Sequence, residues 1–235
     1  MFAQIAAAFE HGGLWMWPIL GIQLASIAIV LERTFALFFQ RKLNQKAVVE
    51  TFEEGIRRGE LEAVIEKARN LSDAPVARAV VAGAKAAVTL GGKDEIQGKM
   101  DEVLITENGC LDRRIGFLSM LGNVATLTGL LGTITGMIRS FAAVSYANPA
   151  EKAALLSAGI SEAMNCTAYG LITAIPALVA YSILQNRANR LAEDLNQSAL
   201  RAFNWLSFTF EPAGFASLRT PKGRRENGVS PSFNA

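Results

Sequence analysis

Residues 157–181, SAGISEAMNCTAYGLITAIPALVAY, are long and apolar enough to cross a bilayer, although they include a glutamate, an asparagine and a proline. A helix that spans a membrane needs about 20 predominantly apolar residues. Two further windows, from about Trp15 to Phe39 and from Ile115 to Ile138, are also poor in charge, and charged residues crowd between the windows. The sequence therefore predicts three transmembrane helices separated by aqueous segments, not one soluble core.

The predicted fold is all-α: a polytopic membrane protein with three transmembrane helices, of which the second and third are long and extend into a cytoplasmic helical bundle. Apolar residues at helical spacing between the first two windows, and again after the third, support this bundle. The expected segments are an outer N-terminal segment (1–14), a first span (15–39), a cytoplasmic helical domain (40–114), a second span (115–145), a short outer loop (146–153), a third span (154–186), a cytoplasmic helix (187–211) and a disordered basic tail (212–235).

The distribution of Lys and Arg predicts the orientation. No base precedes the first window, which is also longer than the apolar part of a signal peptide, so we expect a retained helix. Bases gather just after this window, from Arg41 on, and just before the second window, ending at Arg114. The loop after the second window has a single base, Lys152. By the positive-inside rule the amino terminus lies outside, and the long loop and carboxyl terminus lie inside.

Small residues form one stripe on each of the last two spans. Residues three or four apart share a helix face, and small side chains in lipid permit close helix contact. The stripes therefore predict helix packing, while their threonine hydroxyls leave open a second interpretation, a narrow polar path. The second span has Gly122, Thr126, Gly129, Thr133, Gly136 and Ser140 in its stripe, and the third has Gly159, Ala163, Thr167, Gly170, Ala174 and Ala177.

Glu162 is the only acid or base in the third span. An ionised carboxylate inside a membrane is costly unless it is paired, neutralised or hydrated. Asn165, Tyr169, Thr173 and Pro176 share its side of the helix, and such a polar stripe should face protein or water. Pro176 also deprives the carbonyl one turn earlier of its donor. Either Glu162 pairs helices beside a proline kink, or it belongs to a cation pathway or to a contact with another chain.

The aqueous segments contain no pattern typical of catalysis. Ser72-Asp73-Ala74-Pro75 predicts a helix start, and residues 94–115 are expected to run as a helix into the second span. No metal-ligand spacing, phosphate-binding loop or nucleophile with a base is present, and His11 stands alone. We therefore expect no cofactor, no metal and no enzymatic activity, and we interpret Cys110 and Cys166 as packing residues without a disulfide.

Three motifs, WPILGIQLASIAIVLER (17–33), GLLGTITGMIRSF (129–141) and GISEAMNCTAYGLITAIPALVAY (159–181), closely resemble the MotA/TolQ/ExbB proton-channel family, in its ExbB/TolQ branch. The resemblance covers the order of all three spans and the cytoplasmic loop, and the Glu32-Arg33 pair is more similar to ExbB than to TolQ. A flagellar stator of the MotA type would have a fourth span and a larger cytoplasmic domain.

The resemblance implies the larger subunit of a bacterial inner-membrane transducer driven by the proton motive force, with its amino terminus in the periplasm. Such subunits form a homopentamer around the single membrane helices of an ExbD- or TolR-like partner, which carries the proton-binding aspartate, and they work with envelope proteins of the TonB or TolA type. By motif, Thr133 and Thr167 would line the pore, Glu162 would be the functionally sensitive acid and Pro176 the proline of the third span. The ion, proton or sodium, and the process that is energised stay open.

Two rival interpretations do not require ion flow. A membrane scaffold would use the stripes and Glu162 only to hold a partner. A small transporter would have its own substrate cavity, but three spans contain no pair of inverted repeats.

Overall fold

The computed structural model describes residues 13–40, 45–71, 73–89 and 91–209. His11, Arg41, Ser72 and the basic tail 212–235 lie outside these residues. Every regular element in the described residues is a helix, which confirms the all-α prediction. The elements are α2 (Met16–Phe35), the π-helical turn η1 (Ala36–Gln40), α3 (Gln45–Arg58), α4 (Leu61–Asn70), α5 (Pro75–Thr89), α6 (Lys93–Asp112), α7 (Ile115–Tyr146) and α8 (Pro149–Thr209).

Three helical stretches of the described residues are long and apolar enough to cross a membrane: Met16–Phe38, Lys93–Tyr146 and Pro149–Phe208. Each of them contains most or all of one apolar window of the sequence. Large apolar side chains remain exposed along these helices, for example Leu127 on α7 and Met164 on α8. Exposed apolar surface of this extent is expected where the surrounding solvent is lipid rather than water.

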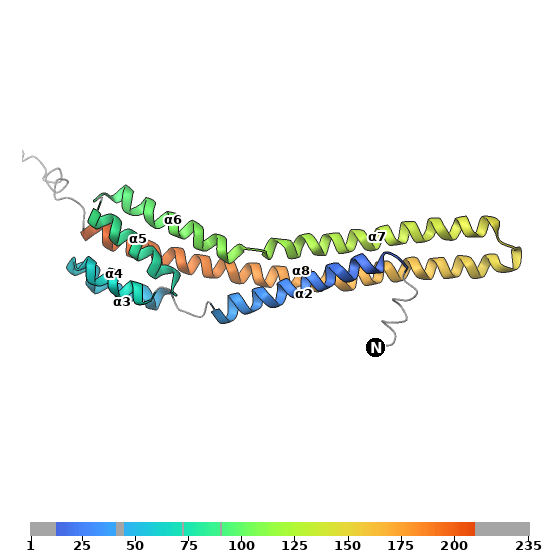
Figure 1. Cartoon of the computed structure of the whole chain (residues 1–235), viewed down its shortest axis with the longest axis horizontal. Coiled ribbons are helices and arrows are strands. Elements are labelled where there is room, and N and C mark those ends of the chain that lie inside the picture. The colour runs from blue at the N-terminus through green and yellow to red at the C-terminus, as the bar shows by residue number, and fades with distance from the viewer. Residues whose placement is uncertain (1–12, 41–44, 72, 90, 210–235) are drawn as a thin grey trace, which may run out of the picture. The chain divides into compact units, whose positions relative to one another are not determined.

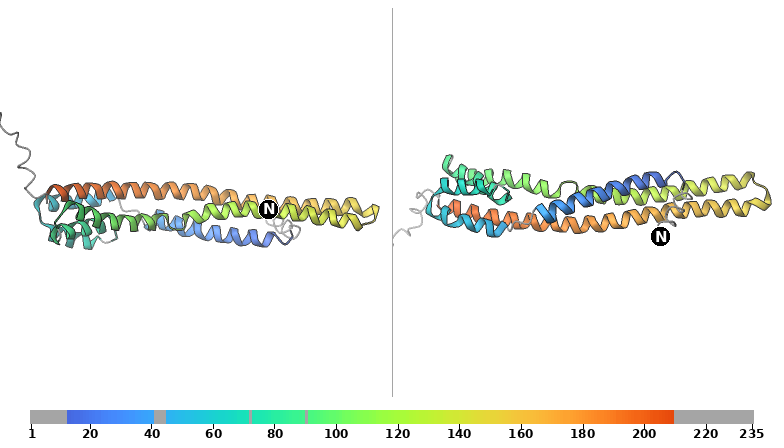
Figure 2. Two further views of the ribbon diagram at one scale, coloured as in Figure 1. Left: turned by 90° about the horizontal axis from the view of Figure 1, so that it is seen from above. Right: turned by 60° about the horizontal axis from the view of Figure 1, so that its bottom comes forward.

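The chain divides into two compact units. The first contains the described residues up to 48 together with 104–198, and it therefore includes α2, α7 and the greater part of α8. Here α7 and α8 run side by side in opposite directions, and α2 packs along α7 (Figures 1 and 2). This unit contains all of the predicted site residues.

The junction between α6 and α7 differs from the expectation of one helix that runs into the second span. The helix stops at Asp112 and resumes at Ile115, because Arg114 adopts a left-handed conformation with φ 63°. Such a conformation cannot continue a right-handed helix and is unfavourable for a residue with a side chain. The Arg114 guanidinium donates to the Glu32 carboxylate of α2 at 2.7 Å, which helps to hold the turn in place.

The connection between α7 and α8 is shorter than the loop expected at 146–153. Only Ala147 and Asn148 separate the two helices, since α8 begins at Pro149. From there α8 continues to Thr209, across Pro176 and across the expected end of the third span at residue 186. The third span and the segment expected to follow it are therefore one continuous helix.

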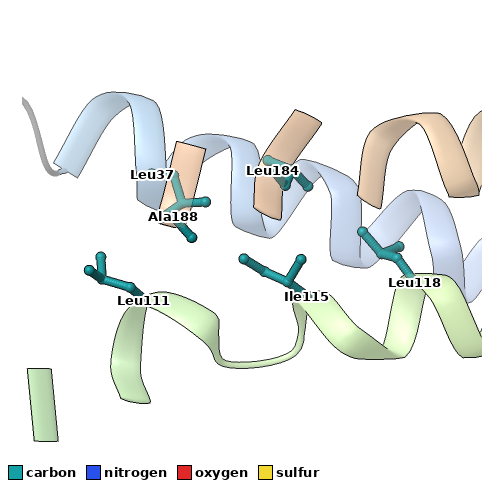
Figure 3. Packing of buried hydrophobic residues seen from close by; sticks show 6 residues of the cluster. All are labelled: Leu37, Leu111, Ile115, Leu118, Leu184 and Ala188. Atoms are coloured by element: carbon teal, nitrogen blue, oxygen red, sulfur yellow. The ribbon is translucent and has the colours of Figure 1, made fainter. Parts of the chain in front are cut away.

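An apolar cluster joins the helices of the first unit at the junction of α6 and α7, as Figure 3 shows. Ile115 and Leu118 of α7 are fully buried in it. The cluster explains why the end of α6 and the start of α7 both stay close to α8 although the chain turns between them. Its members are Leu37, Leu111, Ile115, Leu118, Leu184 and Ala188.

The second unit, 49–103 with the described residues from 199 on, has its own core. Phe52 and Ile56 of α3 are fully buried, and α5 begins at Pro75 as the sequence predicted. A Cβ on Gly83 would lie 2.6 Å from Met100 Sδ, so α5 and α6 touch closely at that point. Ion pairs on the surface, such as Arg57 with Glu53 at 2.9 Å, follow the mixed charge of these helices.

Candidate functional site

The contact between α7 and α8 is made by small residues, and we call it the α7–α8 seam (Gly122, Ala125, Gly129, Gly132, Gly136 and Ser140 on α7; Gly159, Ala163, Cys166, Thr167, Gly170 and Ala174 on α8). A Cβ on Gly129 would lie 3.1 Å from the Cys166 carbonyl oxygen, and one on Gly170 would lie 2.9 Å from the Ala125 carbonyl oxygen. The two backbones are in direct contact, as small residues allow in lipid.

The seam continues toward the connection between the two helices, and we call this its distal end (Gly136 and Ser140 with Gly159 and Ala163). A Cβ on Gly136 would lie 3.1 Å from the Ala163 Cβ, and one on Gly159 would overlap the Ser140 side chain. Ser140 is buried, and its hydroxyl donates to the Leu155 carbonyl at 3.4 Å. The predicted glycine and alanine positions thus lie between the helices, and Cys166 packs there against Gly132.

The predicted threonines occupy three different environments. The Thr167 hydroxyl donates across the seam to the Gly129 carbonyl at 3.2 Å. Thr133 is half-buried and donates within its own helix to the Leu130 carbonyl at 2.6 Å. Thr126 is exposed and donates to Gly122 one turn earlier, so it lies outside the contact that its spacing suggested. Each hydroxyl oxygen keeps lone pairs that can accept a further hydrogen bond.

Glu162 lies at the distal end of the seam in an open cavity of about 630 Å³, together with Arg139 of α7. Its carboxylate packs against Gly13, whose φ of 68° and closeness to Glu162 leave no space for a side chain. Within the described residues neither Glu162 nor Arg139 makes a hydrogen bond or an ion pair. An acid and a base that share a cavity without pairing are available to ions or to groups from another chain.

Sequence reasoning missed Arg139 as a site residue. It directly follows the uncharged window that ends at Ile138, so its position next to a membrane-spanning segment was visible in the sequence. Its relation to Glu162 was not visible, because the two residues come from different helices.

The polar stripe of α8 faces α2 as well as the cavity of Glu162. The Tyr169 hydroxyl donates to the Gln23 side-chain oxygen of α2. Thr173 is buried, and Pro176 lines a smaller cavity between the same two helices. The predicted kink residue therefore lies at the α2–α8 contact, where the helix continues through it.

At the opposite end of the span, the Glu32-Arg33 pair connects α2 to the junction of α6 and α7. Glu32 accepts from Arg114 at 2.7 Å, and the buried Arg33 donates to the Cys110 carbonyl at 3.4 Å. Cys110 itself is exposed, so the expectation that it is a packing residue is wrong for this chain. The charged pair that interrupts the first apolar window thus has a structural use, since it fixes the ends of two helices.

No group of three or more His, Cys, Asp or Glu side chains that could hold a metal is present in the part of the chain that the structure describes. What the arrangement offers chemically is two hydroxyls that donate across the helix contact, those of Thr167 and Ser140, a third hydroxyl on Thr133, and one carboxylate and one guanidinium at the distal end. The hydroxyl, carbonyl and carboxylate oxygens can bind water and cations and can accept from a protonated acid.

The sequence profile of the MotA/TolQ/ExbB proton channel family matches residues 32–197. The Tol-Pal system protein TolQ of Haemophilus influenzae is 34% identical over 122 residues, which are 52% of this chain and 47% of that protein. An ExbB-like biopolymer transport protein of Synechocystis is 30% identical over 178 residues, 74% of this chain and 82% of that protein. The biopolymer transport protein ExbB of Salmonella typhimurium is 37% identical over 73 residues, 31% of this chain and 30% of that protein. The matched part is about half of the TolQ relative and most of the Synechocystis relative.

Proposed function

Because this chain belongs to the MotA/TolQ/ExbB proton channel family, as an energy-transduction subunit of its ExbB/TolQ branch, we propose that it is the pentameric, stator-type subunit of a machine driven by the proton motive force. In this proposal five copies surround the membrane helix of an ExbD- or TolR-like partner. Ion flow through the central pore of this pentamer, which Thr133 of α7 and Thr167 of α8 would line beside the partner helix, then powers transport or mechanical work at the cell envelope.

The observation that carries this proposal is the chemistry of the seam. Polar atoms follow its length, including the Thr167 hydroxyl on the Gly129 carbonyl, but none of the residues that form it carries a carboxylate. A hydroxyl cannot hold a charge through a transport cycle, whereas it can donate to or accept from a carboxylate that alternates between charged and neutral. An acidic side chain from a partner helix would complete such a site.

The membrane potential supplies enough free energy for the proposed role. Each elementary charge that crosses the membrane potential releases about 2.3 kcal/mol per 100 mV. Several protons per cycle therefore supply enough free energy to move a partner helix against its packing.

The proposed location is the bacterial inner membrane, with the amino terminus in the periplasm and the carboxyl terminus in the cytoplasm. The bases near the helix ends support this orientation, since Arg113 and Arg114 directly precede α7 and Arg187 follows the third span. Exposed apolar side chains on α7 and α8 are compatible with lipid and with neighbouring copies.

The experiment compares hydroxyl-deleting variants in vesicles that contain the complex with its single-span partner. An imposed membrane potential drives ion flux, which an internal pH dye reports, and native mass spectrometry reports the oligomer. We expect Thr133→Val and Thr167→Val to lose flux and keep the pentamer. Thr128→Val is the matched control for Thr133→Val, since the Thr128 hydroxyl also donates within α7, to the Val124 carbonyl at 2.7 Å, but Thr128 is not one of the threonines proposed to line the pore. Loss of the pentamer in the two threonine variants would mean that both residues serve helix packing and not ion flow.

A non-conducting scaffold is the second candidate. It is favoured by the fact that Thr133 and Thr167 already donate to carbonyls of this same chain, as packing residues would. Glu162→Gln separates the two functions, because a neutral side chain of equal size should preserve a scaffold and damage an ion pathway. Full activity of this variant in the complex would favour the scaffold.

A further inference from the structure

We propose that the cavity between α2 and α8 beside Pro176 is a binding site for ordered water. The cavity has a volume of about 220 Å³, enough for more than one water molecule, and its walls are mostly apolar. Its polar residues are Gln23 and Ser26 of α2 and Thr173 of α8. All of its lining residues belong to these two helices of one chain.

Thr173 gives the strongest indication. Its side chain is only 4% exposed, yet its hydroxyl has no hydrogen-bond partner among the described residues. A threonine in a helix can donate to a carbonyl three or four residues earlier, as Thr126 does at 3.1 Å and Thr135 at 3.0 Å in this chain. A buried polar group without a partner is unfavourable, and ordered water satisfies many such groups.

Pro176 supplies the second indication. Proline has no N–H, so the Ile172 carbonyl lacks the donor that an α-helix would otherwise give it. Ile172 and Pro176 both line the cavity that contains Thr173. In a membrane such a freed carbonyl must be satisfied by a neighbouring helix, a hydroxyl or water. A water molecule at this point can accept from the Thr173 hydroxyl and donate to the Ile172 carbonyl.

The α2 side of the cavity provides further partners. The Gln23 side-chain oxygen accepts from Tyr169, which leaves the amide hydrogens of Gln23 for another acceptor. The Ser26 hydroxyl donates to the Ile22 carbonyl at 2.8 Å and keeps a lone pair. Together with Thr173 and Ile172 this makes enough polar groups for a buried water, which needs about two to four. A lipid chain could fill the cavity and contact its apolar walls, but it could not form a hydrogen bond with any of these groups.

Radiolytic hydroxyl footprinting in lipid nanodiscs tests the site directly, because radicals form from water and modify the side chains beside it. We expect Ile172 to be modified several-fold faster than Ile175. Ile175 is the matched control, since it is on the same helix and similarly exposed, at 58% against 60% for Ile172, but does not line the cavity. Thr173→Val should reduce the Ile172 rate to that of Ile175, while Thr135→Val, which removes a hydroxyl that donates within α7 and does not line the cavity, should change it little. Equal rates for the two isoleucines in the unmodified protein would overturn the proposal.

A stability measurement gives a second, independent answer. If water pairs the Thr173 hydroxyl, Thr173→Val removes a hydrogen-bonded group and the unfolding midpoint falls. If the cavity is dry or holds a lipid chain, the same change removes an unpaired buried hydroxyl and the midpoint rises. A rise would therefore refute the water site whatever the footprint shows.

Discussion

Gly170→Ala should separate α7 from α8. A Cβ at this position would lie 2.9 Å from the Ala125 carbonyl oxygen and 3.1 Å from the Gly129 Cα. Both are backbone atoms, which cannot rotate away as a side chain does, so the helices themselves must move. This movement would also stretch the hydrogen bond from Thr167 to the Gly129 carbonyl, now 3.2 Å.

The expected loss of stability follows from three contributions. Overpacking of a tight contact costs about 1–3 kcal/mol. A stretched hydrogen bond between membrane helices loses about 0.6 kcal/mol. Alanine favours a helix over glycine by about 1 kcal/mol. We therefore expect the free energy of unfolding to fall by about 0.6–2.6 kcal/mol.

The assay is SDS-titrated unfolding in mixed micelles, followed by tryptophan fluorescence. Gly21→Ala in α2 is the control, because a Cβ at Gly21 would meet open space, with no neighbouring atom within 4 Å. This control should gain up to about 1 kcal/mol from helix propensity alone. If Gly170→Ala is as stable as Gly21→Ala, the two backbones are not in contact and the seam does not hold the helices together.

Three further predictions concern α7 and the residue that precedes it. Arg114→Gly should be more stable than Arg114→Ala by about 0.5–1 kcal/mol. Both variants lose the ion pair with Glu32, but only glycine adopts the left-handed φ without strain. Equal free energies of unfolding for the two variants would contradict this. Leu118→Ala, at a fully buried position, should lose about 2–5 kcal/mol in the same titration, and the exposed Leu127→Ala much less. Arg139→Gln should raise ion flux through the reconstituted complex at low ionic strength and have little effect at high salt. The reason is that a positive charge in the cavity of Glu162 repels cations, and salt screens this repulsion. If the substitution has the same effect on flux at both ionic strengths, Arg139 lies away from the pathway.

Part of the site could be predicted from residue spacing, because the spacing alone decides which residues share one face of a helix. The glycines of α7 and α8 recur every three or four residues, and small side chains in lipid have few uses besides close contact. The same argument failed for Thr126, which is exposed. A stripe of constant spacing drifts around a helix of 3.6 residues per turn, so spacing alone cannot say where the contact ends.

The sequence by itself determined the three spans, the helical class and the positions of the small residues, since composition and periodicity directly reflect burial in lipid. Only the tertiary structure decided which polar groups meet. Arg139 shares a cavity with Glu162, Arg114 turns to reach Glu32, and Thr173 stays unpaired beside Pro176. These relations join residues of different helices or depend on how one helix contacts another. The residue spacing within one helix does not determine the distances between side chains of two helices.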